Sequence, residues 1–445
     1  MSESAFPANF VWGTAAASYQ VEGGHDLEGR GPSIWDTFCR TPGCVAHGHT
    51  GDVSCDQFHR YREDVVLMRE LGAGAYRFSL AWPRVFPQKP GARNPKGFDY
   101  YHRLIDDLLA NGIQPMVTLY HWDLPQYLED AGGWPVRDTA QRFAEFAEAC
   151  FRELGDKVRT WITLNEPWCS AFLGYESGVH APGRHDRPAA YRAAHHLLLG
   201  HGLAAQCFRQ GGFEGKLGIT LVCATPRPAT RREEDVAAAD RAADKPTRMF
   251  LGPLTGRGYP ERHLAAYPDV TMPVKSGDME LIAAPLDFVG LNYYFEDCVG
   301  HAADTPEHLA RVRTAHPRTH MGWDVVPQGL ARHLVAIWKE YRLPHLVVTE
   351  NGCAYPDELT EDGHRCHDPD RIAYLRSHLG ACADAIRAGV PLEGYYLWSL
   401  VDNFEWAYGY TRRFGIVYCD YVDGRRVPKD SFYWYREVIA GHERV

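Results

Sequence analysis

Two glutamates stand directly after short apolar runs and could supply an acid and a nucleophile. Glu166 follows residues 160–164, and Glu350 follows residues 346–349. Cleavage of a glycosidic bond needs such a pair, because one carboxyl group protonates the leaving oxygen while the other attacks the sugar or activates water. A single glutamate in such a place is more often an ion-pair partner or a loop residue, so the inference requires the two side chains to meet in space.

Other apolar runs are followed by polar or aromatic residues that could bind a polar small molecule. These residues are Gln20, Arg77, His121, Trp122, Asn292, Tyr294, Trp398, Glu405 and Trp406. A metal role for His121 is disfavoured because no His-x-His pair lies on the first run. A neutral histidine that hydrogen-bonds a hydroxyl group is the favoured interpretation.

Eight short apolar runs alternate with helical patterns and would position these residues. The runs span residues 10–13, 76–81, 116–120, 160–164, 217–222, 288–291, 346–349 and 395–400. Each is short enough to be a strand buried on both faces. Helical spacing of apolar residues predicts helices at 58–71, 100–111, 139–154, 190–210, 329–341, 370–388 and 432–439. Three of them precede a glycine (Gly72, Gly112 and Gly155), which is a helix stop signal.

This alternation predicts parallel strands joined by crossover helices, and eight such units close into an α/β protein of the (β/α)8 TIM-barrel type with elaborated loops. An open doubly wound sheet is the alternative, but residues 13–17 (GTAAA) are not a glycine-rich phosphate turn. No linker or low-complexity tract divides the chain. A barrel would bring the ends of all strands, with Glu166 and Glu350, to one face.

Composition excludes several classes of protein. Hydrophobic residues make up 45% of the chain and charged residues 23%, which is typical of a folded protein. A net charge of −10 gives no reason to expect nucleic acid or an anionic membrane as a partner. The 12 cysteines are scattered without a CxxC pair, and no signal peptide or long apolar run is visible. We therefore expect a cytoplasmic protein with reduced thiols and no bound metal; a homo-oligomer is possible.

Motifs from the first ten residues almost to the end resemble those of glycoside hydrolase family 1, of the β-glucosidase type. The matching segments are residues 10–15, 18–23, 31–36, 76–79, 163–167, 348–352 and 398–406. This coverage implies a single catalytic domain over residues 1–445. The resemblance implies a retaining mechanism through a covalent glycosyl-enzyme, with Glu166 as acid/base and Glu350 as nucleophile. Arg77, Asn292 and Tyr294 would support the nucleophile. No cofactor is implied, since two carboxyl groups suffice for this chemistry.

The resemblance also assigns residues to the sugar and to the leaving group, or aglycone. The sugar-binding set is Gln20, His121, Trp122, Asn165, Trp398, Glu405, Trp406 and Phe414, with Trp398 as the floor. The aglycone set is Trp168, Cys169, Leu173, His180 and Trp323. Cys169 could approach the acid/base, although a packing thiol is the commoner role for a buried cysteine.

Two residues bear on the substrate. Family members that take 6-phosphorylated sugars typically carry a small residue at the position of Glu405, and a carboxylate there would repel phosphate. Glu166 has not been replaced by glutamine as in some plant thioglucosidases, so an O-glycosidase is expected. The expected substrates are cellobiose, short cello-oligosaccharides and aryl or alkyl β-glucosides, with glucose as product. A β-galactosidase, a β-fucosidase, a transglycosylase and a non-catalytic sugar-binding protein are the alternatives.

Overall fold

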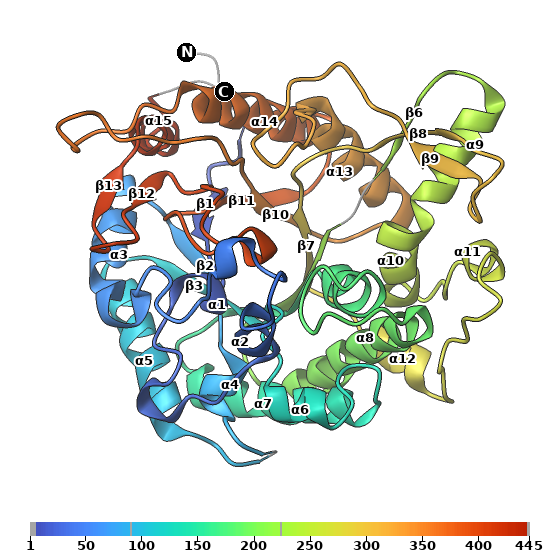
Figure 1. Cartoon of the computed structure of the whole chain (residues 1–445), viewed down its shortest axis with the longest axis horizontal. Coiled ribbons are helices and arrows are strands. Elements are labelled where there is room, and N and C mark those ends of the chain that lie inside the picture. The colour runs from blue at the N-terminus through green and yellow to red at the C-terminus, as the bar shows by residue number, and fades with distance from the viewer. Residues whose placement is uncertain (1–5, 90, 223–224, 443–445) are drawn as a thin grey trace.

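The computed structural model describes residues 6–89, 91–222 and 225–442. Its centre is a closed barrel of eight parallel strands, which the helices surround (Figure 1). In barrel order the strands are β1 (Val11–Ala15), β2 (Ala75–Ser79), β3 (Gln114–Tyr120), β4 (Thr160–Asn165), β5 (Lys216–Val222), β7 (Phe288–Asn292), β10 (Leu346–Asn351) and β11 (Leu392–Trp398). Each of the eight apolar runs forms one of these strands, so the predicted (β/α)8 fold is confirmed.

The seven helices predicted from apolar spacing also form. They are α3 (Gln57–Leu71), α5 (Pro95–Ala110), α7 (Asp138–Leu154), α8 (Arg187–Gln210), α13 (Pro327–Tyr341), α14 (Pro369–Arg387) and α15 (Asp430–Ile439). The C-terminal helix α15 contacts both α14 and α3, which closes the ring of helices beside the first strand (Figure 1). The Tyr435 hydroxyl on α15 also donates to the carbonyl of Gly13 on β1, at 3.2 Å, so α15 packs against the first strand.

Two of the three glycine stop signals act through a left-handed backbone. Gly72 and Gly112 have φ values of +79° and +75°, which glycine adopts without the strain of a side chain. Gly155 differs, because its φ of −71° is right-handed. A Cβ atom at Gly155 would lie 2.3 Å from the carbonyl oxygen of Phe151. Glycine is needed there for close packing and not for a left-handed turn.

Further short elements lie outside the barrel strands and these seven helices. Two small sheets are built from β6 (Arg227–Pro228), β8 (Cys298–His301) and β9 (Leu309–Arg311), and from β12 (Val417–Cys419) and β13 (Arg426–Pro428). The short helices are α1 (Ser18–Val21), α2 (Ile34–Cys39), α4 (Trp82–Val85), α6 (Gln126–Asp130), α9 (Glu233–Ala242), α10 (Met249–Leu254), α11 (Glu261–Ala265) and α12 (Asp278–Ile282). Most span too few residues to show a helical or strand period.

Side chains that point into the barrel can be recognised by hydrogen bonds between strands that are not neighbours. Arg77 on β2 reaches the backbone carbonyl of Thr349 on β10, at 3.1 Å. The Thr220 hydroxyl on β5 donates to the Thr349 hydroxyl at 3.2 Å. Polar groups thus occupy part of the interior near the ends of the strands, where the sequence places the two glutamates.

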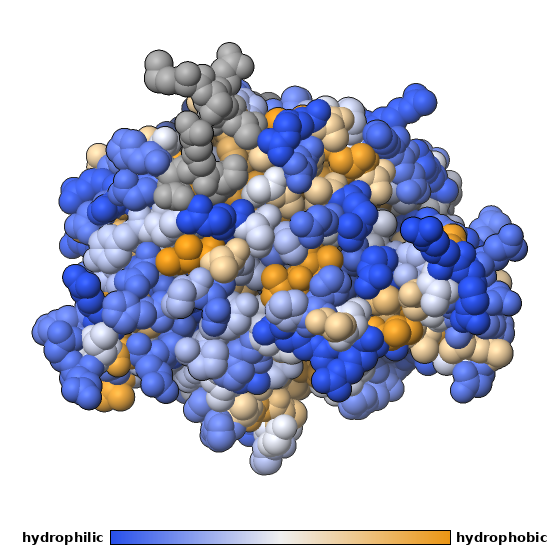
Figure 2. Space-filling view, turned by 90° about the horizontal axis from the view of Figure 1, so that it is seen from above, coloured by the Kyte–Doolittle hydropathy of each residue, from blue (hydrophilic) through white to orange (hydrophobic). Residues whose placement is uncertain are grey.

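One face of the molecule is mostly hydrophilic. In the face that Figure 2 shows, hydrophobic residues appear as small spots scattered among hydrophilic ones. Within the described part of the chain, no helix is both long and apolar enough to cross a bilayer.

Candidate active site

Glu350 lies at the end of β10 and is almost completely buried. Its Oε1 forms an ion pair with the Nη1 group of Arg77, and its Oε2 accepts a hydrogen bond of 2.6 Å from the Tyr294 hydroxyl. A cation and a hydroxyl donor both stabilise the ionised form of a carboxyl group. The structure therefore places Arg77 and Tyr294 as the resemblance implied, in direct contact with Glu350.

Glu166 follows β4 and is also buried, with a left-handed φ of +44°. Its Oε1 accepts a hydrogen bond of 2.7 Å from the Asn292 amide, and its Oε2 lies 2.9 Å from the Cys169 sulfur. Asn292 had been assigned to Glu350, so this assignment needs correction. The Thr349 hydroxyl donates to Asn292 Oδ1 at 2.8 Å and so turns the amide NH2 towards Glu166.

One chain of hydrogen bonds joins the two glutamates. Arg77, which holds Glu350, also donates from Nη2 to Asn165 Oδ1 at 2.6 Å. The same oxygen accepts from Asn292 Nδ2 at 3.0 Å, and Asn292 in turn holds Glu166. Residues from β2, β4, β7 and β10 thus converge on one point at the end of the barrel, and the two carboxyl groups share a single buried network.

Burial in this network changes the proton affinity of the carboxyl groups. It raises the pKa of Glu166 to about 7, and the nearby charge of Glu350 acts in the same direction. Burial, followed by the charges of Glu350 and Glu166, raises the pKa of Glu405 to about 8. A buried carboxyl group with a pKa near neutrality can act as a general acid. Glu166 has this property and contacts no cation directly.

His121 is neutral, and its tautomer follows from its neighbour. Burial, together with the charge of Arg77, lowers the pKa of His121 well below its usual value. Because Asn165 Oδ1 is occupied by two donors, the Asn165 NH2 group faces His121 Nε2, at 3.0 Å. The ring proton is therefore on Nδ1. That nitrogen is buried without a partner among the described residues, so it can donate to a bound molecule.

Gln20 and Glu405 form a second polar group beside the first. The Gln20 amide donates to the carbonyl of Phe404 at 2.8 Å, to Asn403 Oδ1 at 3.1 Å and to Glu405 Oε2 at 3.5 Å. The Gln20 Oε1 atom is buried and has no partner within the described ranges. This unused acceptor and the His121 donor are the kind of groups that bind sugar hydroxyls.

Aromatic rings lie around these polar groups. The His121 ring is stacked with those of Trp398 and Trp406, each with a centroid distance of 5.9 Å, and the Trp122 ring lies 4.5 Å from Trp406. The Trp122 indole also donates to the Asn165 carbonyl at 2.9 Å. These rings offer flat apolar surfaces against which a pyranose can pack.

The residues assigned to the aglycone lie in two places. The Trp323 ring packs against Tyr294 at 5.3 Å and Phe414 at 6.2 Å, which puts both Trp323 and Phe414 beside the Glu350 partner. Trp168, Cys169 and Leu173 belong to the segment after β4, where a π-helix spans Cys169–Glu176. Trp168 packs against Phe172.

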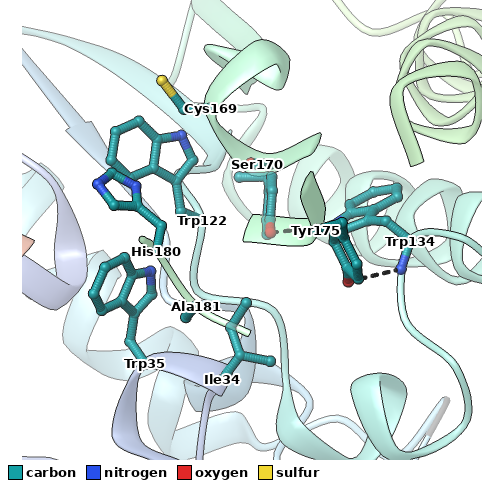
Figure 3. A pocket seen from close by; sticks show the side chains of 10 residues that line it. Ile34, Trp35, Trp122, Trp134, Cys169, Ser170, Tyr175, His180 and Ala181 are labelled. Atoms are coloured by element: carbon teal, nitrogen blue, oxygen red, sulfur yellow. Dashed lines mark hydrogen bonds between the residues drawn. The ribbon is translucent and has the colours of Figure 1, made fainter. Parts of the chain in front are cut away.

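His180 follows this segment in the chain and lines a small cavity. Figure 3 shows His180 between the rings of Trp122 and Trp35, with Cys169 beyond Trp122. The ring of His180 is 5.3 Å from each of these indoles. The cavity measures about 10 Å³, which is room for one water molecule and not for a sugar.

Two residues of the network were not assigned from the sequence. Asn403 accepts from Gln20, and Thr349 orients Asn292. Asn403 lies inside the recognised segment 398–406, and Thr349 directly precedes Glu350, so both were within the motifs. Strict alternation of side chains along a strand would have placed Thr349 and Glu350 on opposite faces, and the register of β10 is irregular between Val348 and Glu350, so alternation gave no signal for Thr349. Among the described residues, no group of three or more His, Cys, Asp or Glu side chains is placed to hold a metal ion.

Comparison with known proteins agrees with this geometry. The family model described as "Glycosyl hydrolase family 1" matches residues 2–444. "Beta-glucosidase A" of Thermotoga maritima is 46% identical, over 99% of each chain. A "Bifunctional beta-D-glucosidase/beta-D-fucosidase" of Bifidobacterium breve is 45% identical over 98% of each chain. A solved structure of the Thermotoga maritima β-glucosidase in complex with deoxynojirimycin superimposes with a TM-score of 0.96, at 46% identity and over 99% of each chain. The chain belongs to glycosyl hydrolase family 1.

Proposed function

We propose that this chain is a retaining β-glucosidase in which Glu350 is the nucleophile and Glu166 the acid/base. The observation that carries the proposal is the buried network in which Arg77 holds Glu350 directly and reaches Glu166 only through Asn165 and Asn292. The relatives named as β-glucosidases support the substrate class. In this assignment Arg77 and Tyr294 hold the carboxyl group of Glu350 for attack, while Glu166 supplies the proton.

The first step cleaves the glycosidic bond. The Glu350 carboxylate attacks C1 of the sugar, and the bond from C1 to the leaving oxygen breaks as Glu166 transfers its proton to that oxygen. The aglycone leaves as a neutral alcohol, and the sugar stays bound to Glu350 as an ester. Because burial raises the pKa of Glu166 to about 7, this group holds its proton at neutral pH far more often than an exposed glutamate does.

The second step needs Glu166 as a base. Once Glu350 is esterified its negative charge is gone, so the contribution that this charge makes to the raised pKa of Glu166 disappears. Glu166 then loses its proton more easily and can remove one from the attacking water. Water adds to C1 from the side that the aglycone left, the ester bond to Glu350 breaks, and β-glucose is released.

Sugar recognition is assigned to the polar and aromatic groups beside the two glutamates. His121 Nδ1 can donate to a hydroxyl, Gln20 Oε1 can accept from one, and Trp398 offers a face for the ring. Glu405, whose Oε2 lies 3.5 Å from the Gln20 amide, offers a carboxyl group to sugar hydroxyls at a place where a phosphate would need a cation, which favours an unphosphorylated sugar. The Bifidobacterium breve relative makes β-fucosides a second substrate class to test.

The cellular setting belongs to the same proposal. Eleven cysteines of the described residues are free thiols, nine of them buried, which suits the reducing cytoplasm. We further propose that short cello-oligosaccharides from cellulose breakdown are the natural substrates.

Trapping of the intermediate tests the role assignment. A 2-fluoro-glucoside with a good leaving group should form a stable ester, and peptide mass mapping should place the added mass on Glu350. The Glu350→Gln variant, treated in parallel, should carry no adduct. An adduct on another residue of the native enzyme would refute the assignment. A panel of gluco-, galacto-, fuco- and 6-phospho-glycosides would then define the sugar.

A further inference from the structure

Cys169 contacts the carboxyl oxygen that carries the transferable proton. The amide of Asn292 is oriented by Thr349 and donates to Oε1 of Glu166. An oxygen that accepts from a fixed N–H group is poorly placed to hold a proton, so the proton of Glu166 belongs on Oε2. The Cys169 sulfur is 2.9 Å from this oxygen.

The backbone brings the thiol to this place. Glu166 has a left-handed φ of +44°, and the amide of Cys169 donates to the Glu166 carbonyl at 2.9 Å. A π-helix begins at Cys169, so the thiol lies about one helical turn after the glutamate and on the same side of the chain. Figure 3 shows the Cys169 sulfur at the edge of the small cavity, pointing away from the side chains across it, such as Trp134.

The thiol stays protonated and is a weak hydrogen-bond donor. Burial, together with the charge of Glu166, raises the pKa of Cys169 well above its usual value. An S–H group can donate to an ionised Oε2 and accept weakly when that oxygen is protonated. A hydroxyl group would favour the carboxylate more strongly, and a methyl group would not favour it at all.

We propose that Cys169 is a positioning residue for Glu166, which orients Oε2 and sets how tightly this oxygen holds the proton that passes to the leaving group. The proposal rests on the proposed acid/base role of Glu166. It differs from a packing role, because it requires substitutions of similar size to change the proton affinity of Glu166 in opposite directions.

The test compares Cys169→Ser, Cys169→Ala and the native enzyme by the pH dependence of kcat/KM with phenyl β-glucoside, whose cleavage needs protonation of the leaving oxygen. The alkaline limb of this profile reports the acid of the free enzyme. We expect this limb to move down by about 0.5–1 pH unit in Cys169→Ser and up by about 0.5 pH unit in Cys169→Ala. Cys382 on α14 is also buried, so Cys382→Ser and Cys382→Ala are control substitutions that should leave the limb in place.

The proposal is overturned if the alkaline limbs of Cys169→Ser and Cys169→Ala coincide with that of the native enzyme. It is also overturned if both limbs move in the same direction. If Cys169→Ala does not fold, the serine variant decides alone: a downward shift supports the proposal and an unchanged limb refutes it. Glu166→Gln separates this result from the proposed function. Loss of the limb in Glu166→Gln with no movement in the Cys169 variants refutes only the role of Cys169, whereas normal turnover by Glu166→Gln refutes the acid/base assignment itself.

Discussion

Replacement of Glu166, the proposed acid/base, by its neutral amide should stabilise the protein at alkaline pH. Burial raises the pKa of Glu166 to about 7, from an ordinary value of 4.5. The folded state therefore binds more protons than the unfolded state between these two values, so stability falls as the pH rises through this range. Above about pH 7 the cost of the buried charge is complete.

The size of the effect follows from the difference between the two pKa values. At about 1.4 kcal/mol for each pKa unit, the charged carboxyl group costs about 3 kcal/mol at pH 8 and about 1 kcal/mol at pH 5. A chain of 445 residues has an unfolding entropy of about 0.9 kcal/mol per kelvin. The Glu166→Gln variant should therefore unfold about 3 °C higher than the native protein at pH 8, and about 1 °C higher at pH 5.

Differential scanning calorimetry of the two proteins at pH 5 and pH 8 measures this difference. The exposed Glu148, which pairs with Arg152 on the surface of α7, supplies a control, and Glu148→Gln should change the midpoint by less than about 1 °C at either pH. The prediction is refuted if the unfolding midpoint of Glu166→Gln exceeds that of the native protein by the same amount at both pH values, or by more at pH 5. Either result would show that burial does not raise the pKa of Glu166.

Three further outcomes are expected. The kcat/KM of the native enzyme for phenyl β-glucoside should fall about tenfold per pH unit above about pH 7, because Glu166 loses its proton there. The kcat/KM for 2,4-dinitrophenyl β-glucoside should stay constant, because dinitrophenolate leaves without an acid. An alkaline limb shared by both substrates would contradict this. Glu350→Ala should lower kcat for either substrate by at least about a thousandfold, and turnover close to native would be decisive against its role. Lys429→Met should lower the unfolding midpoint by about 3–5 °C, because fully buried Lys429 donates hydrogen bonds of 2.6 and 2.8 Å to Asp357 and Asp402. Lys157→Met, which breaks a partly exposed ion pair with Asp106, should lower it by less than about 1 °C. Equal effects of the two changes would refute the argument.

The barrel could be predicted because its signal is local and repeated. Each strand is buried on both faces, so it appears in the sequence as a short continuous apolar run, and eight such runs alternate with helical patterns. The positions of Glu166 and Glu350 followed from the same reasoning, since both stand at the end of a run. The short loop strands gave no such signal, because two to four residues are too few to show a repeated alternation.

The hydrogen bonds of the site could not be predicted from the sequence. The motif places Asn292 near the glutamates, but the direction of its amide is decided by the hydroxyl of Thr349 on the neighbouring strand. Likewise Cys169 reaches Glu166 because of a left-handed backbone at a glutamate and a π-helix after it, and neither has a compositional signature. Such contacts depend on tertiary packing that no single segment encodes.

The different roles proposed for the two glutamates can be traced to where one arginine makes its contacts. Arg77 is fully buried and meets Glu350 directly, whereas it reaches Glu166 only through the amides of Asn165 and Asn292. A cation in contact stabilises a carboxylate far more than one screened behind two neutral amides, because the interaction energy falls with distance. The same network therefore stabilises charge on Glu350 and leaves Glu166 to the effects of burial and of its negatively charged neighbour, which favour the proton. Esterification of Glu350 removes that negative charge. The interaction that favours the proton on Glu166 in the first step is therefore lost when the second step needs Glu166 as a base.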